Sequence, residues 1–434
     1  MTLPLVAVVG RPNVGKSTLV NRIAQQQRAI VHEEAGVTRD RNYVRADWAG
    51  RDFTLIDTGG LDFGADVPMA EAIHRQAMIA AEEADVILFV LEGPAGVMPQ
   101  DEEIADVLRR SGKPILLVVN KADTPGDESY KYPFYSLGLG EPMLVSAIHG
   151  TGSGDLLDEL VALLPETHLA VEEEGLLNIA IVGRPNAGKS SLLNRLIGIE
   201  RSVVSDVPGT TRDSIDTLVE LEGKKYRFVD TAGLRKRAKV EEAVEYYGFV
   251  RVLRALDRAH LALLVIDPTA GVGEADQKAA DYAKQRNCAT IVVINKRDTL
   301  SGEQLKEFVA DTMDKLRFIS YAPFASVSAR TGQGVERLPK KIEDVAAEYS
   351  REVSTPALNS FLGELKQRGH TVSRGGKTLK LKYAAQVGTR PPSFQFFVNH
   401  PRLVDAGYRR FLENRLREAF GLQGTPILLK FRSA

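Results

Sequence analysis

The stretch Gly10-Arg-Pro-Asn-Val-Gly-Lys-Ser17 stands directly after the apolar run Leu5–Val9, and it recurs as Gly183-Arg-Pro-Asn-Ala-Gly-Lys-Ser190 after the run Asn178–Val182. The glycines of this G-x4-G-K-S pattern permit a tight turn whose backbone N–H groups converge on an anion. A helix that starts at the lysine adds the partial positive charge of its N-terminus. Two such loops, each between a strand and a helix, predict two sites for a nucleotide triphosphate.

Four further motifs recur in the same order, at offsets of 173, 173, 175 and 182 residues: Thr38-Arg-Asp40 as Thr211-Arg-Asp213, Asp57-Thr-Gly-Gly60 as Asp230-Thr-Ala-Gly233, Asn120-Lys-Ala-Asp123 as Asn295-Lys-Arg-Asp298, and Val145-Ser-Ala147 as Val327-Ser-Ala329. A solenoid repeats every ~20–50 residues, so this period indicates a duplicated domain instead.

Each copy is expected to alternate short apolar strands with helices. The expected strands are Leu5–Val9, Phe53–Ile56, Val86–Leu91 and Ile115–Val119, then Asn178–Val182, Tyr226–Val229, Leu261–Ile266 and Ile291–Ile294; the expected helices include Ala70–Glu83 and Glu241–Leu256. Apolar strands alternating with helices predict an α/β fold with a mainly parallel sheet covered on both faces.

The chain is expected to divide at an acidic linker, 167–175, which separates a first nucleotide-binding domain, 1–166, from a second, 176–350. Residues 351–434 form a different, small α+β domain. Its expected elements are a helix at Thr355–Gln367, strands at Thr378–Gln386 and Ser393–Asn399, a helix at Asp405–Phe420 and a strand at Pro426–Phe431.

Charge is distributed unevenly along the 434 residues, although the net charge is only −1. Residues 1–170 hold 14 basic and 25 acidic side chains, residues 171–350 hold 27 of each, and residues 351–434 hold 15 basic and 5 acidic. The basic end favours a polyanionic partner such as nucleic acid. The alternative, that this end docks on the acidic first domain, has equal weight from charge alone.

Other features exclude a membrane protein. The longest apolar runs are far short of the ~18 residues that a membrane span needs. The N-terminal stretch has no basic region and no cleavage site of a signal peptide. The single cysteine, Cys288, cannot form an intramolecular disulfide, fits a cytoplasmic location and is expected to be buried.

Paired residues of the two copies are expected to act on the phosphates and on Mg²⁺. Lys16 and Lys189 reach the β- and γ-phosphates, Ser17 and Ser190 ligate Mg²⁺, Asp57 and Asp230 hold Mg²⁺ through water, Thr38 and Thr211 close on Mg²⁺ and the γ-phosphate, and Gly60 and Gly233 donate backbone N–H to that phosphate. Taken singly, a threonine in such a loop is usually only a solvated residue.

The carboxylates of Asp123 and Asp298 are expected to select guanine. Each can accept two hydrogen bonds from the N1–H and N2–H₂ edge, whereas adenine would leave the carboxylate unpaired. The full predicted nucleotide-contacting set is Gly10, Arg11, Pro12, Asn13, Val14, Gly15, Lys16, Ser17, Asp57, Asn120, Lys121, Asp123, Ser146 and Ala147 in the first copy, and Gly183, Arg184, Pro185, Asn186, Ala187, Gly188, Lys189, Ser190, Asp230, Asn295, Lys296, Asp298, Ser328 and Ala329 in the second.

The ordered motif set is similar to that of translation-factor-class GTPases. Two such units followed by a small basic domain resemble the EngA (Der) family of double-GTPase ribosome assembly factors, over essentially the whole chain. The resemblance implies GTP and GDP as ligands, a C-terminal domain of K-homology (KH)-like fold, a monomer, and assembly of the large (50S) ribosomal subunit as the task. The readings left open are a signalling GTPase with a protein-docking tail, and an RNA-binding module with incidental hydrolysis.

Two further expectations come with the resemblance. Leu61 and Leu234 stand where Ras-like GTPases carry a water-orienting glutamine, so intrinsic turnover should be slow. Asn13 and Asn186 match an asparagine that binds an activating K⁺ ion in relatives with such a hydrophobic residue. The alternative role for these asparagines is to stabilise the loop.

Two regions differ from what a simple duplication would give. The segment after Leu61 is acidic (62–66), whereas the segment after Leu234 is basic (235–239), so the two copies should not contact the same partner surface. The tail has one G-x-x-G motif, Gly421–Gly424, which does not lie between two helices as the RNA clamp of KH domains requires. Basic residues of the tail remain candidates for phosphate contacts: Arg374, Lys377, Lys380, Lys382, Arg409, Arg410, Arg415 and Arg417.

Overall fold

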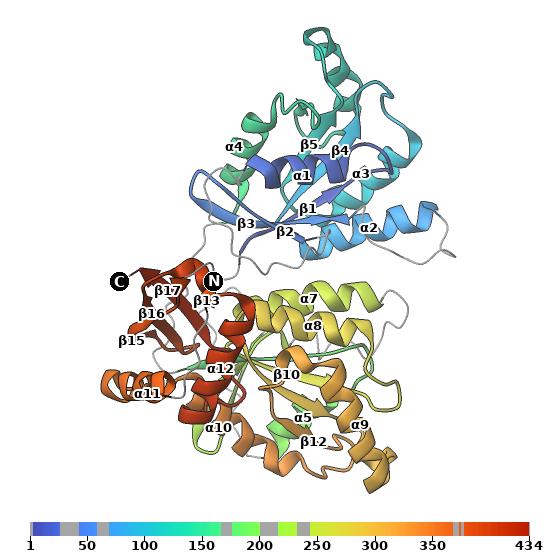
Figure 1. Cartoon of the computed structure of the whole chain (residues 1–434). Helices are drawn as coiled ribbons and strands as arrows, with labels where there is room; N and C mark the ends of the chain where they lie inside the picture. Colours follow the sequence, from blue (N-terminus) through green and yellow to red (C-terminus); the bar gives the residue numbers. More distant parts are fainter. Residues whose placement is uncertain are drawn as a thin grey trace. The chain divides into compact units, whose positions relative to one another are not determined.

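The computed structural model describes residues 3–26, 43–58, 69–165, 176–199, 216–231, 244–367, 373–374 and 377–433. The chain forms two compact units, Met1–Ala170 and Val171–Ala434 (Figure 1). The first unit holds the first copy of the repeat. The second holds the other copy together with the basic tail.

The first unit is built on a six-stranded sheet of order β2-β3-β1-β4-β5-β6. Its strands are β1 (Leu5–Val9), β2 (Tyr43–Trp48), β3 (Arg51–Asp57), β4 (Val86–Glu92), β5 (Ile115–Asn120) and β6 (Pro142–Leu144). The pairing is parallel throughout, except that β2 runs antiparallel to β3. The mainly parallel α/β sheet predicted from the apolar runs is therefore confirmed, with one antiparallel edge strand added.

Helices cover both faces of this sheet. They are α1 (Lys16–Gln26), α2 (Met69–Glu83), α3 (Pro99–Ser111), the 3-10 segment Pro125–Leu137 and α4 (Ser153–Leu163). Val6 and Val8 of β1 belong to a core with α1 and α4, whereas Ala7 and Val9 belong to a second core with α2 and α3. Because successive side chains of a strand point to opposite faces, a strand buried on both sides must be apolar at every position.

The second nucleotide-binding domain repeats this architecture. Its sheet has the order β12-β11-β10-β7-β9-β8. The strands are β7 (Leu177–Val182), β8 (Thr217–Leu221), β9 (Lys224–Phe228), β10 (Leu261–Ile266), β11 (Ala289–Ile294) and β12 (Phe324–Ser326), and the helices are α5 (Lys189–Ile199), α7 (Val244–Arg258), α8 (Glu274–Gln285), α9 (Gly302–Lys315) and α10 (Leu338–Tyr349). Cys288, just before β11, is fully buried, as expected.

The tail folds into a separate α+β layer with its own core. Its elements are α11 (Thr355–Gln367), β13 (Ser373–Arg374), β14 (Lys377–Thr378), β15 (Leu381–Gly388), β16 (Ser393–Val398), α12 (Ala406–Phe420) and β17 (Leu428–Ser433). Strand β16 pairs antiparallel with β15 and parallel with β17. The predicted order of helix, two strands, helix and strand is found, and the short pair β13 and β14, which was not predicted, stands before β15.

The tail is joined to the second nucleotide-binding domain by the loop Gly421–Gly424, which follows α12. The N–H of Gly424 donates to the carbonyl of Tyr321 at 2.8 Å, and its carbonyl accepts from the N–H of Thr290 in β11 at 2.7 Å. This G-x-x-G motif therefore attaches the tail to the second nucleotide-binding domain. In the part of the chain that is described, no helix has the length and apolarity required to traverse a bilayer.

Candidate nucleotide-binding sites

The first phosphate loop connects β1 to α1, and Lys16 is the first residue of that helix. Its Nζ atom donates to the carbonyls of Gly10 and Arg11, both at 2.7 Å. The side chain is only 6% exposed, and this burial lowers the pKa of Lys16 to about 8, against the opposing effect of the Asp57 carboxylate. The loop thus wraps around a single buried ammonium group.

Two glycines of this loop have no room for a side chain. A Cβ at Gly10 would lie 2.2 Å from the carbonyl oxygen of Val90, and a Cβ at Gly15 would lie 2.2 Å from Nδ2 of Asn120. Gly15 also has a φ of +97°, which side-chain-bearing residues rarely adopt. The glycines in the motif are therefore required by close contacts with β4 and with the first asparagine of N-K-x-D.

The second loop, between β7 and α5, reproduces this geometry. Nζ of Lys189 donates to the carbonyls of Gly183 and Arg184 at 2.8 and 2.6 Å. A Cβ at Gly188 would lie 2.1 Å from Nδ2 of Asn295. The repeat seen in the sequence is thus a repeat in three dimensions.

The carboxylate that follows the third strand of each copy lies at the loop edge of its sheet. The register of β1 on β3 pairs Val8 with Asp57, which is 3% exposed. Asp230 follows β9 in a left-handed backbone conformation with φ of +55°. The carboxylate of Asp57 and the hydroxyl of Ser17, at the start of α1, are oxygen donors of the kind that Mg²⁺ prefers, so the residues fit that ion.

Several predicted site residues lie outside the described residues. They are Thr38, Gly60, Thr211 and Gly233, together with Leu61, Leu234 and the acidic and basic segments 62–66 and 235–239. Their predicted roles therefore stay predictions.

The asparagine of each N-K-x-D motif is hydrogen-bonded to the phosphate loop and to the serine–alanine loop of its site. Nδ2 of Asn120 donates to the carbonyl of Val14 at 2.8 Å, and its Oδ1 accepts from the N–H of Ala147 at 2.9 Å. Asn120 is 2% exposed. Its side chain therefore fixes the distance between the phosphate loop and the serine–alanine loop, a role that the sequence alone did not reveal.

Asn295 makes the same two bonds in the second copy. Its Nδ2 donates to the carbonyl of Ala187 at 2.8 Å, and its Oδ1 accepts from the N–H of Ala329 at 3.0 Å. The end of the site that would hold a base is thus joined to the end that would hold phosphates in both domains.

The aspartates of N-K-x-D are oriented by serine hydroxyls. Ser146 Oγ donates to Oδ1 of Asp123 at 2.5 Å, and Ser328 Oγ donates to Oδ1 of Asp298 at 2.6 Å. The Ser328 hydroxyl, with a smaller contribution from the Arg330 guanidinium, holds the pKa of Asp298 below its usual value. A carboxylate that stays ionised and fixed in direction is suited to accept paired hydrogen bonds from a guanine edge.

The two sites differ beside this aspartate. Arg330 contacts Oδ2 of Asp298 at 2.8 Å, whereas the residue after Ala147 in the first copy is Ile148, which is 60% exposed. The second site therefore carries a cation at its base-binding end where the first carries an apolar side chain.

Carboxylates that support the loops were not identified from the sequence. Arg11 pairs with Asp101 at 2.8 Å and Arg184 pairs with Asp276 at 2.7 Å, and both aspartates are fully buried at the start of a helix. Burial raises the pKa of Asp276, against the opposing effect of Arg184. The two aspartates stand 175 residues apart, the offset of the N-K-x-D motifs, so the repeat itself was a signal that could have found them.

The lysines of the N-K-x-D motifs are anchored in the same way. Lys121 pairs with Glu92 at 2.7 Å, and Lys296 pairs with Asp267 at 2.5 Å. Both lysines have positive φ, +66° and +54°, which turns the chain sharply after β5 and β11. The aliphatic parts of these side chains are thereby held beside the base-binding end of each site.

Comparison with known families identifies both parts of the chain. A family model described as a 50S ribosome-binding GTPase matches residues 5–121 and again residues 178–296. A model described as the KH-domain-like C-terminal part of EngA bacterial GTPase enzymes matches residues 352–432.

Relatives match over the full length. GTPase Der of Desulforudis audaxviator (strain MP104C) is 49% identical over 437 residues, which cover 100% of this chain and 99% of that protein. GTPase Der of Heliobacterium modesticaldum (strain ATCC 51547 / Ice1) is 46% identical over 430 residues, covering 98% and 97%. Among solved structures, Era in complex with MgGDPNP and a fragment of 16S ribosomal RNA is 20% identical, with 76% of this chain and 93% of that one covered and a TM-score of 0.31.

Proposed function

Because the chain belongs to the EngA (Der) family of double GTPases, we propose that it is a nucleotide-gated assembly factor for the large (50S) ribosomal subunit. The chain is a GTPase: it binds GTP and GDP and hydrolyses GTP to GDP and phosphate. The observation that carries the proposal is the presence of two phosphate loops of the same geometry and one basic domain in a single chain. We further propose that it acts as a monomer in the cytoplasm.

The proposed domains are 1–166 and 176–350 for the two GTPase domains, 167–175 for the linker and 351–434 for the KH-like domain. In each GTPase domain the phosphate loop binds the polyphosphate, with Lys16 or Lys189 leaving the loop carbonyls to contact it. Asp123 or Asp298 selects guanine. Mg²⁺, when bound, neutralises phosphate charge, and the donors proposed for it are Ser17, Thr38, Asp57, Ser190, Thr211 and Asp230.

The proposed gate is the ordering of the loops at Thr38 and Thr211 when GTP is bound. Hydrolysis removes the γ-phosphate and with it the contacts that keep these loops closed. Affinity for the subunit then falls and the protein dissociates. Because Leu61 and Leu234 cannot orient the attacking water, turnover is slow until another group supplies the missing interaction.

Co-sedimentation with separated ribosomal subunits tests this proposal. Binding to the large subunit with a non-hydrolysable GTP analogue, and not with GDP or without nucleotide, is the expected result. Loss of binding at higher salt would place the contacts on phosphates. Binding that is equal in all nucleotide states refutes the gate, and the variants Lys16→Ala and Lys189→Ala separate the contributions of the two sites.

We also propose that K⁺ activates both sites through Asn13 and Asn186. These asparagines have φ of +66° and +61°, so the backbone alone could account for them, because asparagine tolerates this conformation. The variants Asn13→Gly and Asn186→Gly keep the backbone and remove the amide. Higher GTP turnover in KCl than in NaCl, lost in the glycine variants, supports the ion site; equal turnover in both salts excludes it.

A further inference from the structure

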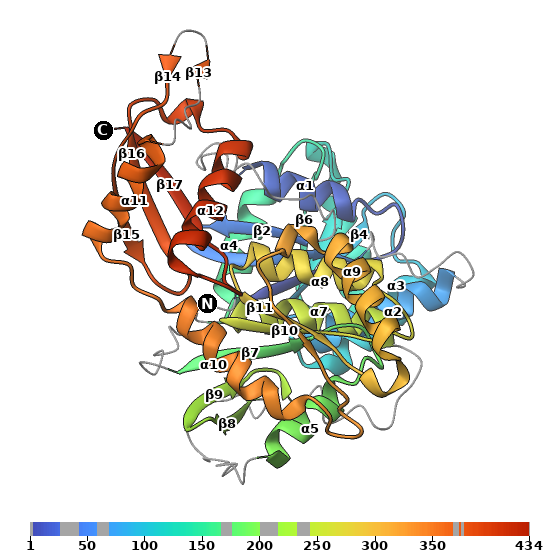
Figure 2. The same ribbon diagram turned by 60° about the horizontal axis from the view of Figure 1, so that its bottom comes forward.

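The C-terminal sheet has one face that its helices do not cover. Phe394, Phe396 and Val398 of β16 are fully buried in the core with α11 and α12. Figures 1 and 2 both place α12 between this sheet and the second GTPase domain. Because side chains alternate along a strand, the intervening positions of β16 point to the opposite side. This opposite side is called the outer face here.

An aromatic pair stands on the outer face. Tyr383 of β15 is in register with Phe397 of β16, and their ring centroids are 5.9 Å apart. Tyr383 is 44% exposed, whereas the other phenylalanine and tyrosine rings described in this domain are buried or half-buried. Phe397 therefore lies on the face opposite to the core residues Phe394 and Phe396.

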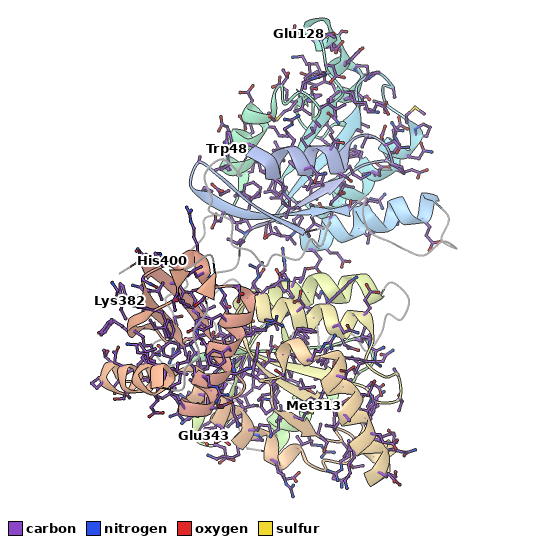
Figure 3. The ribbon with its side chains drawn as sticks, viewed as in Figure 1. Trp48, Glu128, Met313, Glu343, Lys382 and His400 are labelled. Carbon is purple, nitrogen blue, oxygen red and sulfur yellow. The ribbon has the colours of Figure 1, made fainter. Side chains whose placement is uncertain are left out.

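Basic side chains continue the same cross-strand rows on β17. Arg432 is in register with Phe397, and Lys430 is in register with Gln395 one row along. Both basic residues are exposed. Lys382, next to Tyr383, is exposed at the margin of the domain (Figure 3). Two rings and two cations therefore share a single surface.

Acidic residues are absent from this sheet, since β15, β16 and β17 contain no aspartate or glutamate. The five acidic residues of the tail lie on its helices or directly before them: Glu352, Glu364, Asp405, Glu413 and Glu418. The outer face therefore combines basic side chains with strands that hold no acidic residue.

Three arginines of α12 are engaged within the protein. Arg417 stacks on the ring of Tyr321 at 4.6 Å, Arg409 stacks on Phe431 at 5.0 Å, and Arg415 pairs with Glu418 at 2.6 Å. The Gly421–Gly424 loop is bonded to the second GTPase domain. The G-x-x-G motif of the tail is therefore engaged in a contact within the protein.

We propose that the outer face of the C-terminal sheet binds single-stranded RNA. Unstacked bases lie on the rings of Tyr383 and Phe397, while Lys430 and Arg432 contact the phosphates. Aromatic rings on an open sheet bind single-stranded RNA in this manner because every base has a face that can stack. The proposal rests on the proposed function in taking RNA as the polyanion, and it adds which surface is used and which form of RNA is bound.

Fluorescence anisotropy with the full-length chain tests the proposal. The probe is a labelled oligoribonucleotide of about 12 nucleotides, compared with a duplex of the same length. The single strand is expected to bind more tightly. Tyr383→Ala should weaken its binding by about 5- to 150-fold, which is the measured range for loss of one stacked base. Tyr383→Phe keeps the ring and should retain the affinity.

Charge variants provide the matched control. Arg432→Gln should lower the slope of log affinity against log salt by about 0.7, the value for one phosphate contact on a single strand. Arg410→Gln removes the same charge from α12, where the side chain is exposed, and should change the affinity much less. Thermal unfolding of each variant checks that the domain is intact.

Three results would overturn the proposal: tighter binding of the duplex, equal affinity of Tyr383→Ala and the unaltered chain, or an equal loss in Arg410→Gln and Arg432→Gln. Absence of any RNA binding would also overturn it. If Arg432→Gln then alters cross-linking of the tail to the acidic first domain, the outer face makes a contact within the chain instead. Co-sedimentation of the unaltered chain with large subunits tests the proposed function independently of the oligonucleotide assay. A failure of the proposed function can therefore be told apart from a failure of the RNA-binding proposal.

Discussion

Replacing Asn295 by alanine should disable the second nucleotide site while leaving the first intact. The substitution orphans two buried groups, the carbonyl of Ala187 and the N–H of Ala329, now bonded at 2.8 and 3.0 Å. Each unsatisfied buried group costs about 1–3 kcal/mol, so the arrangement that binds nucleotide is destabilised by about 2–6 kcal/mol. At 1.4 kcal/mol per tenfold change, GDP binding at this site should weaken by about 30- to 20 000-fold.

Equilibrium titration with a fluorescent GDP analogue measures this loss. The unaltered chain should bind two equivalents, and Asn295→Ala should bind one at low micromolar ligand. Asn120→Ala is the matched variant, since its side chain makes the corresponding bonds to Val14 and Ala147. It should remove the other equivalent. Two equivalents bound with unchanged affinity by Asn295→Ala would refute the view that this side chain holds the loops together.

Three further predictions follow from individual side chains. Burial lowers the pKa of Lys16 to about 8, and a bound polyphosphate favours the charged form of this side chain. The affinity of the first site for GDP should therefore fall as pH rises above about 8. A GDP affinity that stays constant from neutral to alkaline pH would contradict this. Burial raises the pKa of Cys288 to about 12, so a thiol reagent such as DTNB should label it only after unfolding, and rapid labelling of the native chain would show the opposite. Arg330 is 83% exposed, so its ion pair with Asp298 contributes little free energy. Arg330→Ala should therefore change GDP affinity at the second site by less than about fivefold. Ser328→Ala should weaken it more, because the Ser328 hydroxyl donates to Asp298, and a larger loss in Arg330→Ala would contradict this.

Elements buried on both faces were predictable from the sequence. Strands β1 and β10 have the predicted bounds, because a central parallel strand must be apolar at every position. The phosphate loops were equally predictable, because the glycine positions are dictated by contacts with backbone and asparagine atoms that no side chain could share.

Edge strands were missed because only apolar runs were sought. Strands β2 and β8 are each exposed along one edge, and their sequences mix polar and apolar residues. The sequence held one sign of these strands, the glycine that ends the turn after each of them. The turns are Ala49-Gly50 and Glu222-Gly223, and both positions have positive φ, the geometry of a two-residue hairpin turn. Each pair ends in glycine, as such turns favour, although the first residue is an unusual choice.

Contacts between distant segments could not be predicted from local pattern. The bridging role of Asn120, the anchoring of Arg11 by Asp101 and the attachment of Gly424 to Thr290 each join residues that are 27 to 134 positions apart. Such pairs depend on the packing of the finished fold. The motifs therefore specified the ligand class, whereas the structure was needed to show what holds the motifs in place.

The attachment of the tail has a consequence for how pieces of this gene can be exchanged. Tyr321 carries both a backbone bond to Gly424 and the stacked guanidinium of Arg417, and Glu348 accepts from the N–H of Leu422 at 2.7 Å. A reading frame cut after residue 350 would encode a second GTPase domain in which the N–H of Thr290, at the start of β11, and the carbonyl of Tyr321 have lost their partner. Recombination between relatives would therefore have to transfer the second GTPase domain and the tail as one inherited block.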